Sequence, residues 1–225
     1  MPVSESRPHP GGAQSQAAAN LDVQILAPHW REWSQSAERE TPAGWKRMVE
    51  ALAQLQDTVA GTIPSAEAVA EAAELMTRAQ QILAGSEVAA ERQLFGRHLA
   101  EPTRGQTFSP PLWVEDYTDG ELIGRTRFGR FHSGNGGVTH GGAIALMFDD
   151  AMGRTSDLAV PERSRTVSLT VDFRSLTPLE TDLEVRARLV AHEGRKRTIR
   201  GWLRDGDRLC AEATALFIEL RPDQR

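Results

Sequence analysis

Apolar residues follow two different periods along the chain, and the change between them lies near the middle. In the N-terminal part they recur every three or four residues, as in Trp45, Met48, Leu52 and Leu55, which is typical of one face of an amphipathic helix. In the C-terminal part they alternate with polar residues, as over Val167–Phe173, which indicates a half-buried strand. The pattern predicts a helical region followed by a β-rich region.

These periods divide the chain into four segments. Residues 1–20 are rich in Pro, Gly, Ser, Gln and Ala and are expected to form a disordered tail. Residues 21–101 should form a helical N-terminal extension, with helices over about 44–60 and 65–84 and a shorter one over 86–99. Residues 102–112, which contain Ser-Pro-Pro, are expected to be a linker. Residues 113–222 should then form the β-rich domain.

One segment inside the β-rich domain departs from the alternation. His140–Met152 has apolar residues nearly all round a helix, so it should be buried on most sides. It follows one hairpin and precedes strands expected over 167–173, 183–191, 196–203 and 209–220, with a turn at Asp205-Gly206. That order predicts an α+β hotdog fold, in which an antiparallel sheet wraps round a central buried helix.

Composition excludes some classes of function. The net charge is −5, from 26 basic and 31 acidic residues, which gives no support for binding nucleic acid. No apolar run approaches the roughly 20 residues that a membrane span needs. The single cysteine, Cys210, cannot form a disulfide within the chain, and this is compatible with a reducing compartment. We therefore expect a cytoplasmic protein without a membrane span.

The apolar helix contains two adjacent carboxylates and begins with two glycines. An ionised Asp149 or Asp150 is costly in apolar surroundings unless it is paired, so the two are candidates for function. For Asp150 we favour a structural role. Gly141 and Gly142 would expose backbone N–H groups at a helix start, where a polarised carbonyl oxygen is stabilised. From the glycines alone, a capped, glycine-rich turn that holds nothing is the favoured interpretation.

The spacing of these groups has a consequence for assembly. Asp149 lies nine residues after His140, which is about 13 Å along a helix and half a turn round it. A single carbonyl group cannot contact both ends of that span. If both ends act on one substrate, they must come from two subunits, as a two-fold symmetric dimer would allow. The pattern therefore predicts a homodimer with composite sites, which could associate further as a dimer of dimers.

The stretch Asn135–Gly142, followed by Asp149 and Gly153, resembles the PaaI-like hotdog thioesterases and, more closely, the THEM-type acyl-CoA thioesterases. The shared pattern is His-Gly-Gly, a carboxylate nine residues after the His, and a Gly four residues further on. The strand Thr166–Phe173 is also similar, and the resemblance covers roughly Trp113 to Leu220. It implies hydrolysis of acyl-CoA thioesters in fatty acid metabolism without a cofactor.

The resemblance implies roles for individual residues. The N–H of Gly141 would polarise the thioester carbonyl, with Gly142 beside it, while Asp149 would activate water or attack directly. Thr166 would hold the water, although strict alternation places it away from Leu169. His140 would orient the site. Asn135 falls near a position where the family has Asn or Gln.

Cations are needed for the phosphates of CoA. In similar proteins a basic residue at the position of the run Arg195, Lys196 and Arg197 meets the nucleotide, and Arg174 is a weaker candidate. An edge strand protected by charge would look the same in sequence. No metal site is predicted, because His132 and His140 lack neighbouring ligands at the spacing of zinc sites.

Two other functions remain compatible with the sequence. A hotdog hydratase or dehydratase would use a His and a carboxylate on one substrate carbon, and a non-catalytic domain would bind acyl-CoA without cleaving it. The N-terminal extension could cover the sheet, form a lid over the acyl tunnel or build a larger oligomer. Its residues Trp30, Trp33 and Trp45 are expected to pack in a core rather than at an interface.

Overall fold

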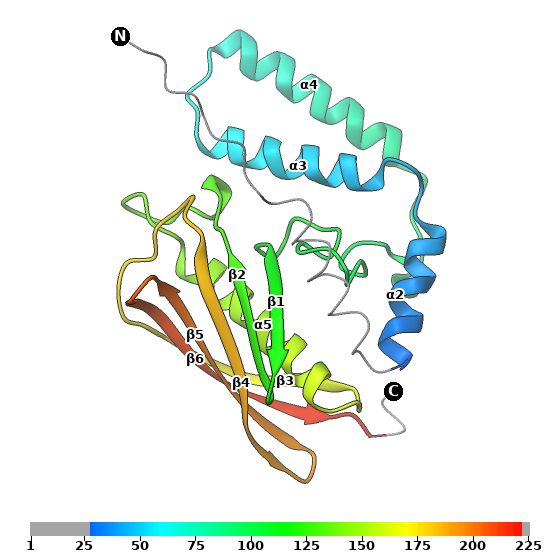
Figure 1. The fold of residues 1–225 in the computed structure, drawn as a ribbon. Coiled ribbons are helices and arrows are strands. Elements are labelled where there is room, and N and C mark those ends of the chain that lie inside the picture. Colours follow the sequence, from blue (N-terminus) through cyan, green and yellow to red (C-terminus); the bar gives the residue numbers. More distant parts are fainter. Residues whose placement is uncertain (1–27, 222–225) are drawn as a thin grey trace, which may run out of the picture.

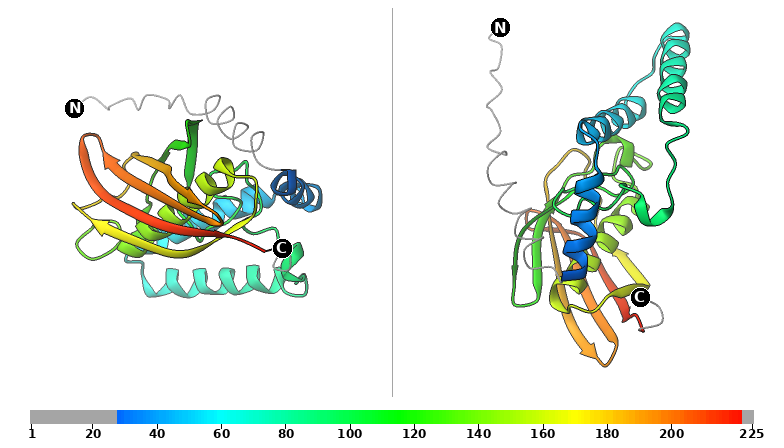
Figure 2. Two further views of the ribbon diagram at one scale, coloured as in Figure 1. Left: turned by 90° about the horizontal axis from the view of Figure 1, so that it is seen from below. Right: turned by 90° about the vertical axis from the view of Figure 1, so that its right-hand side faces the viewer.

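The computed structural model describes residues 28–221, so the expected tail at residues 1–20 lies outside the described residues. A six-stranded antiparallel sheet has the order β1-β2-β4-β5-β6-β3 and curves round one long helix, α5 (Figures 1 and 2). The strands are β1 Leu112–Thr118, β2 Glu121–Thr126, β3 Ser164–Phe173, β4 Leu183–Glu193, β5 Lys196–Asp205 and β6 Arg208–Glu219, and the helix is α5 Gly141–Ala159. This arrangement confirms the predicted hotdog fold.

The hydrophobic core lies between α5 and the concave face of the sheet. From the helix, Ile144, Met147, Phe148 and Met152 are at most 2 % exposed. They pack with side chains of every strand, among them Leu112, Leu122, Leu183, Val185, Ile199, Ala211, Ala213 and Phe217. A Cβ atom at position 201 would lie 2.9 Å from the ring of Phe148, so Gly201 lets this ring approach the sheet.

The N-terminal extension consists of α2 Pro28–Glu40, α3 Trp45–Ala60 and α4 Ala66–Leu83, followed by an irregular segment that leads to β1. Helix α3 packs against the short 3₁₀ helix η2 Arg130–His132, whereas α4 projects away from the sheet (Figure 2). Trp30 and Trp33 contact each other edge to face and stack with Arg163 and Arg97. These two tryptophans therefore pack within the chain, as expected.

The helix expected over residues 86–99 does not form. Only the 3₁₀ helix η1 Ala90–Arg92 is present, and the backbone turns at Gly96, whose φ is 83°. This turn allows the Arg97 guanidinium to donate hydrogen bonds to the Trp33 carbonyl and the Ser36 hydroxyl of α2. Contacts between distant parts of the chain therefore outweigh the local helical tendency.

Candidate active site

The start of α5 is capped by a histidine. His140 has extended backbone angles, and its Nδ1 accepts a hydrogen bond of 2.9 Å from the backbone N–H of Gly142. Because Nδ1 accepts, the neutral ring carries its proton on Nε2, which is then free to act as a donor. The Gly142 N–H, which we expected to bind substrate, is therefore already hydrogen-bonded to His140.

The backbone N–H of Gly141, unlike that of Gly142, has no hydrogen-bond acceptor among the described residues. No hydrogen bond within residues 28–221 takes this N–H as its donor. The first N–H groups of a helix have no partner inside the helix and lie at its positive end. Gly141 is therefore the backbone donor that the fold leaves available to a carbonyl oxygen at this position.

The loop before α5 is fixed by its backbone. The N–H of His140 donates to the His132 carbonyl over 2.8 Å, and the N–H of Gly134 donates to the Val138 carbonyl over 2.7 Å. Gly136 and Gly137 have φ values of 77° and 73°, which glycine adopts without strain. Asn135 is exposed in this turn, and no hydrogen bond of the described residues joins it to the other candidate residues.

The structure brings Asp149 and Thr166 together. The Thr166 hydroxyl donates a hydrogen bond of 3.0 Å to an Asp149 carboxylate oxygen, and both residues are exposed in the isolated chain. We expected Asp149 to be buried, and this expectation was wrong for the single chain. Asp149 projects from the face of α5 that the sheet does not cover.

A β-bulge explains how Thr166 reaches the helix. Strict alternation would put Thr166 on the outer face of β3, together with Ser168 and Thr170. In the structure Thr166 pairs with Phe217 of β6 and Ser168 pairs with Leu216, so Val167 is an extra residue. The extra residue reverses the alternation, as β-bulges do. Thr166 therefore shares the helix-facing side of the strand with Leu169.

Asp150 has the structural role that we favoured. Its carboxylate forms ion pairs with Arg104 at 2.9 Å and with Arg154 at 3.1 Å, and its side chain is 11 % exposed. Burial alone would raise the pKa of Asp150, but the two guanidinium groups outweigh burial and lower it. Asp150 is therefore a buried anion held in its charged form.

The expected cationic residues lie in three different environments. Arg195 and Lys196 are exposed at the turn between β4 and β5, and the Arg195 carbonyl accepts a hydrogen bond from the N–H of Glu219. The neighbouring Arg197 is fully buried and donates to Ser156 and to the Glu162 carbonyl, so it holds the structure together. Arg174 pairs with Asp172 and Glu212, which compensate its charge.

A cavity of about 720 Å³ adjoins the start of α5. One side is formed by α5 and the loop before it, and the other by the N-terminal extension. Its lining residues are Gln56, Phe95, Thr107, Phe108, Phe131, His132, Ser133, His140, Gly142, Ala143 and Leu146. The contribution of Phe95 and Phe108 was not anticipated, because both lie in segments without a periodic pattern.

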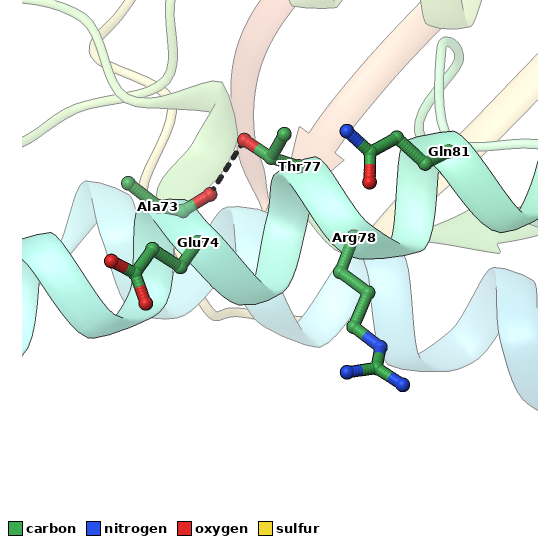
Figure 3. A pocket seen from close by; sticks show the side chains of 5 residues that line it. All are labelled: Ala73, Glu74, Thr77, Arg78 and Gln81. Carbon is green, nitrogen blue, oxygen red and sulfur yellow. Dashed lines mark hydrogen bonds between the residues drawn. The ribbon is translucent and has the colours of Figure 1, made fainter.

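Another hollow runs along the surface of α4 (Figure 3). It is lined only by side chains of that helix, namely Ala73, Glu74, Thr77, Arg78 and Gln81. The Thr77 hydroxyl donates back to the Ala73 carbonyl of the same helix. With a single helix as its wall, this hollow cannot enclose a ligand, and the candidate site is the region around α5.

Within residues 28–221, no helix is both long and apolar enough to cross a membrane. In the same residues, no group of three or more His, Cys, Asp or Glu side chains is arranged to hold a metal ion.

Comparisons with known proteins agree with the geometry. A family model described as "Acyl-CoA thioesterase N-terminal domain" matches residues 132–218, which contain α5, β3, β4 and β5 and nearly all of β6. Among curated proteins, acyl-coenzyme A thioesterase THEM4 of Bos taurus is 36% identical over 98 residues, 43% of this chain and 40% of that protein. The protein of the same name from Xenopus laevis is 36% identical over 134 residues, 59% of each chain. The chain thus spans about half the length of these relatives.

The fold has a counterpart among solved structures. A crystal structure of a thioesterase superfamily protein aligns with a TM-score of 0.67 and 24% sequence identity. The alignment covers 80% of this chain and 92% of that chain, which is more than the sheet and α5 account for. Part of the N-terminal extension is therefore included in the shared fold.

Proposed function

We propose that this chain, whose C-terminal hotdog domain is similar to THEM-type acyl-CoA thioesterases, is a member of that family and is itself an acyl-CoA thioesterase. It would hydrolyse an acyl-CoA thioester to the free acid and CoA. The observation that carries the proposal is the hydrogen bond between Thr166 and Asp149 on the open face of α5. No packing requirement of the described chain accounts for an exposed, oriented carboxylate at this place.

The path of β3 supports a site shared between two subunits. The start of β3 lies beside Asp149, to which Thr166 donates a hydrogen bond. The end of β3 lies beside Gly141, because a Cβ atom at position 141 would be 3.0 Å from the ring of Phe173. If the β3 strands of two copies pair antiparallel, the start of one lies beside the end of the other. Asp149 of one subunit would then approach Gly141 of its partner. The two groups would meet although they are about 12 Å apart along one helix.

The edge of the sheet is suited to such pairing. β3 is the last strand in the sheet order, and its Val167 and Phe173 side chains are 56% and 57% exposed. A long edge strand with exposed apolar side chains favours association with another strand. On α5, a Cβ atom at Gly153 would meet nothing within 4 Å, so this chain does not itself require a glycine there. A closely approaching partner would require one.

The chemistry follows from these positions. The Gly141 N–H would donate to the thioester carbonyl oxygen and stabilise the negative charge that develops on it. Asp149 would accept a proton from water as the water attacks the carbonyl carbon, with Thr166 helping to orient that water. Collapse of the tetrahedral intermediate breaks the C–S bond, and the CoA sulfur takes up the proton. Direct attack by Asp149, followed by hydrolysis of the anhydride, is the other route.

The CoA phosphates need cations near the site. Arg195 and Lys196 are at the same end of the sheet as Thr166, because Lys196 and Arg197 pair with Ile218 and Phe217 of β6. Their exposed, uncompensated positions make them better partners for the phosphates than Arg174, whose charge two carboxylates already balance. His140 would support the site by presenting Nε2–H beside Gly141.

The test is the release of CoA, followed with a thiol-trapping reagent over a panel of acyl-CoAs. We expect the wild type to release CoA and Asp149→Asn to lose about 10²–10⁴-fold in kcat. Asp205→Asn, at the end of β5, is the matched control and should retain full activity. Asp149→Asn activity within a few-fold of the wild type would refute the mechanism. Hydration of crotonyl-CoA, or acyl-CoA binding without thiol release, would instead favour a hydratase or a binding domain.

A further inference from the structure

The cavity beside the start of α5 lacks any charged lining residue of the Asp, Glu, Lys or Arg type. Burial lowers the pKa of His132 despite the nearby Asp57 carboxylate, so this ring is neutral at neutral pH. The phosphates of CoA, which need cations, would find no partner in such a cavity. An uncharged and largely apolar part of a ligand would suit it.

Three aromatic side chains surround the cavity and are only half covered. Phe95, Phe108 and Phe131 are 48%, 64% and 47% exposed, and all three face the same space. Exposed aromatic side chains gathered round a hollow are typical of a binding site for an apolar group. On the opposite side, Ala143 and Leu146 of α5 complete an apolar surface.

The walls of the cavity are held in place by polar contacts. The Gln106 side chain is 5% exposed, and its carbonyl oxygen accepts hydrogen bonds from the N–H groups of Phe108 and Ser109. Asp57 of α3 accepts a hydrogen bond of 2.8 Å from the N–H of Phe131. The ring of His132 then contacts Phe131 edge to face at 5.5 Å. These contacts therefore hold Phe108 and Phe131 at the cavity.

The cavity also adjoins the proposed site. His140 and Gly142, on either side of the free Gly141 N–H, both line it. We propose that this cavity holds the acyl chain of the substrate, and that Phe95 of the N-terminal extension and Phe108 of the segment before β1 determine the chain length accepted. This inference rests on the proposed thioesterase function, because a carbonyl bound at Gly141 places the acyl chain at the mouth of the cavity.

Two variants should act in opposite directions on chain-length preference. Phe108→Ala removes part of the wall and should lower kcat/KM for dodecanoyl-CoA about tenfold, in the range that hydrophobic pockets discriminate, with little change for acetyl-CoA. Phe108→Leu should restore most of the loss. Gln56→Trp, on α3, should fill the cavity and shift the preference toward short chains. Leu75→Ala, an equally exposed apolar residue of α4, is the control and should leave the profile unchanged.

A binding measurement separates this inference from the proposed function. Isothermal titration with a non-hydrolysable dodecyl-CoA thioether and with CoA itself should show added affinity from the alkyl chain, and Phe108→Ala should remove it. If the wild type releases no CoA from any substrate but this pattern holds, the thioesterase proposal fails and the cavity assignment stands. If Phe108→Ala weakens CoA and the thioether equally, the cavity holds the pantetheine arm and our inference is wrong. It is also wrong if Phe108→Ala and Gln56→Trp both behave like Leu75→Ala.

Discussion

Asp149 and Asp150 are neighbours in sequence, but they face different surroundings. A helix turns by about 100° per residue, so adjacent side chains point to different sides of α5. Asp149 is exposed and accepts one hydrogen bond from Thr166, whereas Asp150 is enclosed by Arg104 and Arg154. The Asp149 carboxylate is open to solvent, whereas the Asp150 carboxylate is enclosed in ion pairs that hold the segment before β1 to the helix. The partners of each residue, and not its chemical type, distinguish the two.

The sharpest test of this comparison is to replace each aspartate in turn. We expect Asp150→Asn to lower the free energy of unfolding by about 3 kcal/mol, because the buried guanidinium of Arg154 and the partly buried one of Arg104 lose their counter-charge. Asp149→Asn should leave stability within about 0.5 kcal/mol, as an exposed substitution usually does, while activity falls. Denaturant unfolding and thiol release, measured on both variants, give the two readouts. Equal stability losses would remove the distinction.

The loss of stability caused by Asp150→Asn should depend on pH. The pKa of Asp150 is lowered in the folded chain, so its stabilising contribution is present above its ordinary value of 3.8 and disappears as the pH falls through the lowered pKa. The penalty of Asp150→Asn should therefore be large at pH 7 and shrink toward pH 3. A penalty that does not change with pH would show that the lost contribution is not ionic.

Thr166 should have a smaller effect than Asp149. Thr166→Ala removes the hydroxyl that orients the carboxylate and should lower kcat by about ten- to a hundredfold, at the lower end of acid–base assistance. Thr166→Ser keeps the hydroxyl and should recover most of the activity. If Thr166→Ser is as inactive as Thr166→Ala, the hydroxyl is not the important feature of this residue.

A third carboxylate of α5, Asp157, should contribute a pH dependence of stability opposite to that of Asp150. Burial raises the pKa of Asp157 from 3.8 to about 6, against the attraction of four nearby arginines. The folded chain therefore binds this proton more tightly than the unfolded chain, and stability declines as the pH rises from about 4 to 6. Asp157→Asn should flatten this decline and increase stability at pH 7 by on the order of 1 kcal/mol. Urea unfolding at a series of pH values measures the free energy of unfolding of the wild type and of Asp157→Asn.

Much of the fold could be predicted from the sequence, because periodic patterns report local structure. The alternation in β3, β4 and β6 and the apolar helix over residues 140–152 were sufficient for the hotdog fold. The helix expected at residues 86–99 failed because Arg97 makes its contacts with α2, which no local pattern encodes. Such contacts join residues that are far apart in the chain.

The candidate site was predictable in its parts but not in its geometry. The spacing of His140, Gly141 and Asp149 identified the helix that carries the site. The position of Thr166 depends on the bulge at Val167, which is set by pairing with β6 and cannot be counted from alternation. Arg104 lies in a segment that reads as a linker, so its ion pair with Asp150 was not foreseen.

The ion pair between Arg104 and Asp150 also bears on how the molecule can be dissected. A shortened chain that starts at β1 would contain every strand and the whole of α5, and by its topology it would be a complete hotdog. It would nevertheless lack Arg104, and Asp150 would keep only Arg154 against its buried charge. We therefore expect a stably folded unit to include Arg104 and to begin before the first strand of the sheet, within the stretch that leads into it.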